Sequence, residues 1–171
     1  DSQKTYHLFI TTDNLGGTRQ YEKNTLKFYR NVILLRRLSY GERKDIIYEV
    51  TNIDINTTFL LEMKELNKIF NLNYSQITIN TMVYMSCITE IIQYLIEYKK
   101  KNTNCYLRYL VHDFHSVCLN YNLYTNGHYC RLQCSNEKCD LRLADQRFSI
   151  KEWRTLWQSL FKCVDEIRCF S

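Results

Sequence analysis

Tyr6-His7-Leu8-Phe9-Ile10-Thr11-Thr12, near the start of the chain, is the stretch on which the predicted fold depends. It is rich in aromatic and β-branched residues, and the polar, glycine-rich segment 13–17 ends it, so we predict a strand. Two further strand regions are predicted, within residues 24–38 and over Asp45–Ile53, separated by a turn at residues 39–42. The first third of the chain therefore indicates a sheet.

The middle of the chain indicates helix. Asn56-Thr57-Thr58 provides a cap, and the segment Phe59–Phe70 follows without a helix-breaking residue. Residues 71–75 interrupt this helix, and a second one is predicted from about Thr81 to Lys100. Its apolar residues recur at helical spacing, whereas Glu90, Gln93 and Glu97 face the other way.

The last third repeats this order of strands followed by helix. Strands are predicted over residues 105–116, 119–124, 128–134 and 139–143, and Asn126-Gly127 is a strong signal for a hairpin turn. Ser149 and Glu152 form a capping box for a final helix that runs to near Phe170. Its tryptophans and leucines recur at steps of three and four residues, which predicts a core-facing stripe.

The chain is therefore predicted to be a single domain over residues 1–171, with two halves, 1–102 and 103–171, that each place strands before a helix. Because a helix with one apolar face needs a sheet to cover, the two halves are expected to join their sheets edge to edge. The predicted fold class is α+β, with one antiparallel sheet covered on one face by two long helices, the first of them broken.

Cysteines and glycosylation sequons indicate the compartment. All eight cysteines follow residue 86, and sequons occur at Asn56 and Asn73. Both features are typical of an oxidising compartment, so we predict a disulfide-stapled glycoprotein that is secreted or displayed at the cell surface. We expect a mature or trimmed ectodomain whose anchor, if it has one, lies outside this chain, because no signal peptide begins at Asp1.

Charge and hydropathy exclude two classes of partner. The net charge is +5, and basic residues alternate with acidic ones except at Lys99–Lys101, so no basic stripe for nucleic acid is visible. No apolar run approaches the ~20 residues of a membrane span. We expect neither nucleic-acid binding nor membrane insertion within this chain.

The layout resembles the α1–α2 platform of MHC class I proteins. Lys4–Ile10 is similar to the opening platform strand, Asn122–Tyr129 to the hairpin of the second half, and Lys151–Phe170 to the second platform helix. Among class I-like proteins, the compact viral decoys, such as those of orthopoxviruses, are the most similar group. The resemblance implies a non-presenting ligand or decoy, without a light chain, for a natural killer or T-cell receptor of the host.

The resemblance also implies a disulfide between the first strand of the second half and its helix. Here it would join Cys105 to Cys163, which lies on the shoulder of the apolar stripe, rather than to Cys169, which points away from it. Cys134 and Cys139 are expected to staple a hairpin. The other cysteines depart from the family pattern and stay unassigned.

Receptor contacts are expected on the outward faces of the two predicted helices. The polar candidates are joined by Tyr94 and Arg154, because hot spots are enriched in aromatic residues and arginine. An ordinary solvated helix face is the alternative for every one of them. The full set is Glu90, Gln93, Tyr94, Glu97, Arg154, Gln158, Lys162 and Asp165.

Other chemistry is less well supported. His128, Cys130, Cys134 and Cys139 match no common zinc spacing, and a hairpin turn would divide them. A cysteine–histidine catalyst with His112 or His115 would need a free, activated thiolate. His112 and Asp113 would point to opposite faces of a strand, which disfavours a metal site. We predict no enzyme, cofactor or metal.

Two alternatives to the receptor ligand stay open from the sequence. The first is a disulfide-rich, helical cytokine-like factor, which requires the N-terminal segment and residues 104–144 to form helix or loop. The second is an intracellular zinc protein in which the sequons are accidental. Strand content separates the first alternative from the platform, and bound zinc would reveal the second.

Overall fold

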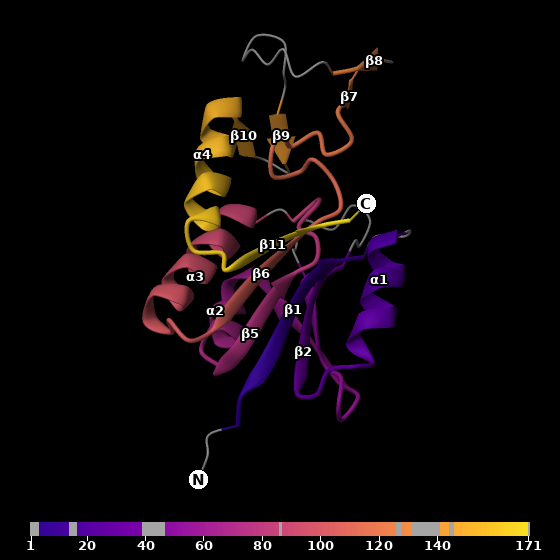
Figure 1. The fold of residues 1–171 in the computed structure, drawn as a ribbon, viewed down its shortest axis with the longest axis vertical. Coiled ribbons are helices and arrows are strands. Elements are labelled where there is room, and N and C mark those ends of the chain that lie inside the picture. The colour runs from indigo at the N-terminus through magenta and orange to yellow at the C-terminus, as the bar shows by residue number, and fades with distance from the viewer. Residues whose placement is uncertain are drawn as a thin grey trace.

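The computed structural model describes residues 4–13, 17–38, 47–85, 87–125, 128–130, 141–143 and 146–170. A seven-stranded sheet of order β11-β6-β5-β1-β2-β3-β4 is its central element (Figure 1). The strands are β1 (Tyr6–Thr12), β2 (Val32–Arg37), β3 (Ile47–Asn52), β4 (Thr57–Glu62), β5 (Tyr74–Ile79), β6 (Tyr106–Val111) and β11 (Glu166–Cys169). Neighbours from β11 to β2 pair in parallel, whereas β3 and β4 add an antiparallel hairpin at the edge beside β2.

Helices cover both faces of this sheet. On one face lies α1 (Gly17–Leu26), and on the other lie α2 (Asn67–Phe70), α3 (Ile88–Lys101) and α4 (Ile150–Phe161) (Figure 1). A short 3-10 helix, η1 (Met63–Glu65), precedes α2. Two small hairpins, β7 (Tyr124–Thr125) with β8 (His128–Tyr129) and β9 (Leu141–Leu143) with β10 (Gln146–Phe148), lie beyond the main sheet.

The predicted MHC class I-like platform is therefore wrong. Residues 7–10 and 32–35 are continuous apolar or buried runs rather than alternating ones, which is typical of parallel strands that are covered on both faces. In the structure β1 pairs in parallel with β2 on one side and with β5 on the other. The fold is a three-layered α/β arrangement with a mixed sheet. Its strand content also rules out the fold that the helical cytokine-like alternative requires.

Alternate residues of β1 belong to two separate cores. Leu8 and Ile10 join the large core beneath α2, α3 and α4, whereas Phe9 packs with Leu26 in the small core beneath α1. Trp153 and Trp157 of α4 are fully buried in the large core, so the predicted apolar stripe of the last helix is confirmed. The predicted capping box is confirmed as well, because Ser149 Oγ accepts a hydrogen bond of 3.1 Å from the Glu152 amide.

Several element predictions were right and others were wrong. The strands at residues 6–12 and 45–53 are confirmed as β1 and β3, and the second helix, predicted from about Thr81, is confirmed only from Ile88 onward, as α3. Within the predicted strand region 24–38 only β2 is a strand, because residues 24–26 end α1, and residues 119–123 form no strand. The predicted helix Phe59–Phe70 is largely wrong, because Asn56 adopts a positive φ of 49° in a turn and sends β4 back along β3. Of that segment, only η1 and the four-residue α2 are helical.

The last helix is shorter than predicted. It ends at Phe161, and the chain then enters β11, which pairs with β6. Asp165 fixes this return to the sheet, since its carboxylate accepts hydrogen bonds from the Leu107 amide at 2.7 Å and from Lys99 Nζ at 2.8 Å. Ile167 matched the helical spacing although it lies on a strand. The spacing of apolar residues does not reveal long-range contacts such as those of Asp165, so it could not predict where α4 ends.

The predicted disulfide between Cys105 and Cys163 is wrong, because both residues carry free thiols. Cys105 is buried just before β6, whereas Cys163 follows α4 and its Sγ contacts the Ser159 carbonyl oxygen at 3.9 Å. Cys134 and Cys139 lie outside the described residues. The remaining described cysteines, Cys87, Cys118, Cys130 and Cys169, are also free.

Candidate ligand-binding site at the carboxyl ends of the parallel strands

The carboxyl ends of the parallel strands lie along one edge of the sheet, and the connections that leave this edge go to different faces. From β1 the chain passes through α1 on one face to β2, whereas from β5 it passes through α3 on the other face to β6. β1 and β5 are neighbours, so their carboxyl ends flank a topological switch point. Ligands of open α/β sheets bind in the crevice at such a point. The residues at these strand ends are therefore candidates for a binding site.

On the α1 face, Asn80 connects three segments. Its Nδ2 donates to Thr11 Oγ1 and to the Thr18 carbonyl oxygen, both at 3.2 Å, and its Oδ1 lies 2.9 Å from His112 Nε2. Because a carbonyl oxygen only accepts, the Thr18 contact fixes the orientation of the amide. His112 Nε2 therefore carries the proton, and Nδ1 is the unprotonated nitrogen of the neutral ring.

Aromatic side chains enclose this histidine. The Phe170 ring stacks on His112 with centroids 4.5 Å apart, and Tyr21 meets both rings edge to face. Burial lowers the pKa of His112, so the ring is neutral at pH 7. No hydrogen bond to its Nδ1 occurs within the described residues. The stacked ring and the Asn80 contact make His112 a positioned hydrogen-bond acceptor.

On the α3 face, a row of polar side chains crosses three strand ends. Thr12 of β1 is opposite Arg37 of β2, and Arg37 is opposite Tyr48 of β3. The Tyr48 hydroxyl hydrogen-bonds to the thiol of Cys87, one residue before α3 begins. Burial raises the pKa of Cys87 to about 11 and raises that of Tyr48, so both groups are protonated at neutral pH.

Three atoms around this row lack partners. Thr12 Oγ1, Arg37 Nε and Glu90 Oε2 are all buried, and none of them makes a hydrogen bond to another described residue. Arg37 and Glu90 both act electrostatically on Tyr48 and on Cys87, which places the two charged groups around the same contact. A buried polar group without a partner costs about 1–3 kcal/mol, so three of them at one strand edge need an explanation. We name Thr12, Arg37, Tyr48, Cys87 and Glu90 the strand-edge cluster.

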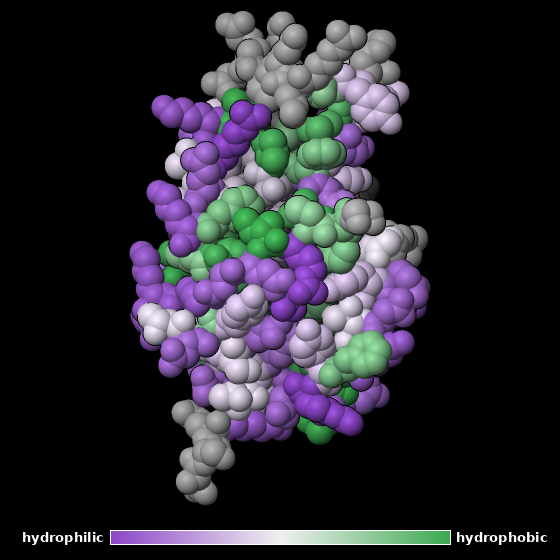
Figure 2. All heavy atoms as spheres, in the orientation of Figure 1, coloured by the Kyte–Doolittle hydropathy of each residue, from purple (hydrophilic) through white to green (hydrophobic). Residues whose placement is uncertain are grey.

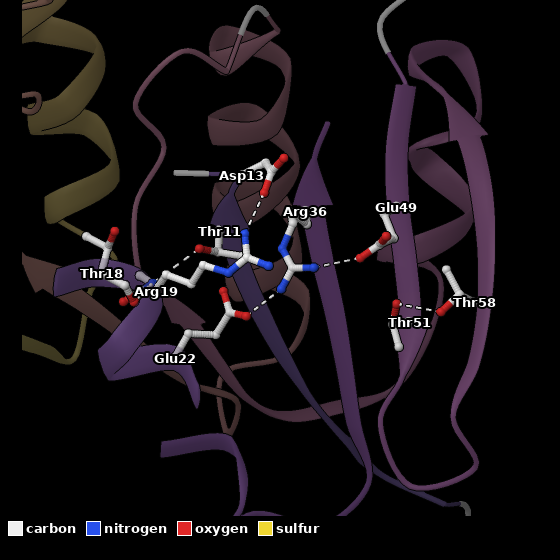
Figure 3. Close-up of polar contacts among 10 residues, drawn as sticks. Thr11, Asp13, Thr18, Arg19, Glu22, Arg36, Glu49, Thr51 and Thr58 are labelled. Carbon is white, nitrogen blue, oxygen red and sulfur yellow. Dashed lines mark hydrogen bonds and ion pairs between the residues drawn. The ribbon is translucent and has the colours of Figure 1, made fainter. Parts of the chain in front are cut away.

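A separate array of charges on the α1 face is internally satisfied. Arg36 of β2 forms ion pairs with Glu22 of α1 and with Glu49 of β3, and Arg19 pairs with Asp13 at 2.9 Å (Figure 3). Each of these charges faces an opposite charge. The array therefore binds α1 to the sheet and offers no unpaired group to a ligand.

The residues predicted to contact a receptor do lie on neighbouring elements. Glu90, Gln93, Tyr94 and Glu97 are on α3, which packs against α4. Arg154 and Gln158 are on α4, Lys162 is its C-cap, and Asp165 lies in the following loop. Gln93, Glu97, Gln158 and Lys162 are exposed, as expected.

Three other members of that set have structural partners, and Glu90 is partly buried. Tyr94 stacks on Phe70, and Arg154 Nε donates to the Val117 carbonyl oxygen at 3.2 Å. Asp165 forms an ion pair with Lys99, and one oxygen of Glu90 is buried. The set is therefore divided between solvated side chains and side chains that stabilise the fold.

Metal and membrane chemistry find no support in the described part of the chain. No group of three or more histidine, cysteine, aspartate or glutamate side chains there is arranged to hold a metal ion. The zinc candidates Cys134 and Cys139 lie outside that part. No helix among the described residues is both long enough and apolar enough to cross a membrane.

Comparison with protein-family models, with curated proteins and with solved structures yields no match to this chain. The geometry of the strand ends is therefore the basis for a functional proposal. His112 and Glu90 were considered from the sequence for other roles, whereas Asn80, Thr12 and Arg37 were not predicted as site residues. Polar residues at the end of each apolar strand run, Thr11-Thr12, Arg36-Arg37 and Asn80, were the signal that would have found all three.

Proposed function

We propose that this chain is a non-enzymatic α/β domain that binds a small polar molecule at the strand-edge cluster. The observation that carries the proposal is the set of three buried, unpartnered atoms: Thr12 Oγ1, Arg37 Nε and Glu90 Oε2. Thr12 is only 5% exposed, so its hydroxyl has no compensating contact with bulk water. A ligand that hydrogen-bonds to these atoms removes their desolvation cost on binding.

The chemistry of the three atoms indicates the ligand class. Arg37 Nε–H is a positively charged donor, Glu90 Oε2 is a negatively charged acceptor, and the Thr12 hydroxyl both donates and accepts. A ligand that complements them carries an acceptor anion and a donor cation. The carboxylate and ammonium groups of a free amino acid meet this requirement.

Binding rather than catalysis is supported by the neighbouring groups. Nucleophilic catalysis by cysteine requires a thiolate, but burial raises the pKa of Cys87 to about 11. The positioned acceptor His112 lies on the opposite face of the sheet from Cys87, so it does not activate this thiol. The cluster thus provides recognition without an activated nucleophile.

Titration of the chain with a panel of free amino acids, followed by amide NMR, tests the proposal. We expect shifts at Thr12, Arg37 and Glu90 with at least one amino acid, and loss of these shifts in Thr12→Val and in Glu90→Gln. Thr5→Val, at an exposed position just before β1, is the matched control. If the wild-type chain shows no shift at these residues at millimolar concentrations, the proposal is wrong.

We propose receptor binding as a second function, now without the platform fold that first suggested it. Its support is that Asn56 of the first sequon is exposed at the tip of the β3–β4 hairpin, accessible to glycosylation, and that Gln93, Glu97 and Gln158 are exposed on two packed helices. The free thiols no longer support an oxidising compartment, so a secreted or cell-surface location rests on the sequons. The absence of binding across a panel of natural killer and T-cell receptor ectodomains would reject this second proposal.

A further inference from the structure

We propose that a groove between α2 and α3 binds a neutral saccharide of one or two rings. The groove lies at the amino end of β5, whereas the strand-edge cluster lies at the other end of the parallel strands. The volume of the groove is about 420 Å³. This volume is at the small end of the ~300–1,000 Å³ that is usual for small-molecule clefts. Most of the residues that line the groove are asparagines or aromatic residues. The lining consists of Asn67, Phe70, Asn71, Leu72, Asn73, Tyr94, Glu97, Tyr98, Lys101 and Asn102.

Four asparagine amides provide the polar recognition. Within the described part of the chain, the side chains of Asn67, Asn71 and Asn73 make no hydrogen bond. Asn102 Nδ2 donates to the Tyr98 carbonyl oxygen at 3.0 Å, which leaves its Oδ1 for a ligand. Each amide presents both a donor and an acceptor, as each sugar hydroxyl does, so the two kinds of group are complementary.

The aromatic side chains provide a rigid apolar wall. Phe70 stacks on Tyr94 with ring centroids 5.1 Å apart and an interplanar angle of 19°. Tyr98 is fixed by the Tyr74 amide, which donates to its hydroxyl oxygen at 2.6 Å. The faces of such rings carry partial negative charge and attract the slightly positive C–H groups of a sugar ring.

The charges of the groove favour a neutral ligand. Glu97 and Lys101 are one turn apart on α3 and carry opposite charges, and neither forms an ion pair with another described residue. A phosphate near Lys101 would also meet the Glu97 carboxylate, whereas a lipid chain would leave the amides without partners. Hydrophilic side chains dominate the lower part of the molecule, where α3 ends (Figure 2).

A saccharide can reach this groove from two sources. Asn73 is the acceptor of the second sequon, so a glycan attached to its side chain would begin inside the groove. The alternative source is a saccharide from solution. Both supply the same chemistry, and only the covalent link distinguishes them.

The test begins with the unglycosylated full chain from bacterial expression. N-acetylglucosamine, its β1,4-linked dimer and mannose are titrated separately into the chain, and amide shifts are followed by NMR. At least one of them is expected to shift Asn71, Tyr94 and Asn102, and Asn67→Ala/Asn71→Ala to weaken its binding about tenfold through lost hydrogen bonds. Gln93→Ala, on the same helix but outside the groove, should bind as wild type does. Inorganic phosphate should shift none of these amides.

Expression through a mammalian secretory pathway distinguishes the sources. If Asn73 carries a glycan that occupies the groove, the groove amides should already be shifted, and glycosidase treatment should restore binding of the free sugar. If Asn73 is bare and free sugar binds, the source is external. The proposal is overturned if none of the sugars shifts the groove amides of the unglycosylated chain, or if the shifts persist in Asn67→Ala/Asn71→Ala.

Discussion

The two faces of the sheet hold their helices by different physical means. Beneath α2, α3 and α4 lies a large apolar core that contains two fully buried tryptophans. Beneath α1 the apolar core is small, and Arg36 of β2 forms ion pairs with Glu22 of α1 and with Glu49 of β3 (Figure 3). Apolar burial supplies most of the stability of a fold. A buried ion pair contributes little net free energy, but removal of one partner is costly because the other charge is left buried and unpaired. We therefore expect the two faces to respond differently to substitution.

The largest loss is expected in the large core. Trp157→Ala removes a fully buried side chain that packs against Tyr109, Phe161 and His115, and should lower the free energy of unfolding by about 5 kcal/mol. Phe9→Ala, in the small core beneath α1, should lower it by about 3 kcal/mol. Urea denaturation of both variants measures the difference. A greater loss for Phe9→Ala would reverse the comparison of the two faces.

A loss of about 3 kcal/mol is expected when the buried ion pair beneath α1 is broken. Arg36→Met leaves the carboxylate of Glu22, which is 5% exposed, without its cation. Arg19→Met is the matched control, because it breaks the more exposed pair with Asp13 and should cost less than ~1 kcal/mol. Similar losses in the two variants would show that burial does not strengthen the dependence on Arg36.

His7 beneath α1 and His115 beneath α4 are the two most deeply buried histidines among the described residues, one on each face. Burial and the nearby charge of Arg108 lower the pKa of His7 to about 4, and burial alone lowers that of His115 to about 3. The unfolded chain takes up protons near pH 6.5 and the folded chain does not, so stability should fall as the pH drops below 6.5, until about pH 4 for His7 and pH 3 for His115.

At pH 5 each histidine should account for about 2 kcal/mol of this loss. His115→Phe, which keeps a ring against Trp153, and His7→Gln should each remove about 2 kcal/mol of the stability change between pH 6.5 and 5. Denaturation at a series of pH values measures both shares. If neither variant flattens the profile, other groups cause the acid sensitivity.

Elements that depend on local signals could be predicted from the sequence, and those fixed by distant contacts could not. The capping box at Ser149 and the apolar stripe of α3 are local, and both predictions were correct. The end of α4 depends on Asp165 reaching Lys99 and the Leu107 amide, which lie far away along the chain. The strand-edge cluster likewise combines residues from four separate segments, so only the polar character of each strand end was visible in the sequence.

The smallest expected effects come from two threonines, and they have opposite signs. Thr51 and Thr58 hydrogen-bond across β3 and β4 at 2.9 Å on the α1 face, so Thr58→Val should lose up to ~1 kcal/mol. The Thr12 hydroxyl on the α3 face has no hydrogen-bond partner among the described residues, so Thr12→Val should gain about 1 kcal/mol in the absence of ligand. Such a gain at the cost of binding is typical of residues kept for function rather than for stability. A loss in Thr12→Val would mean that water already satisfies this hydroxyl, and the case for a ligand would then rest on Arg37 Nε and Glu90 Oε2 alone.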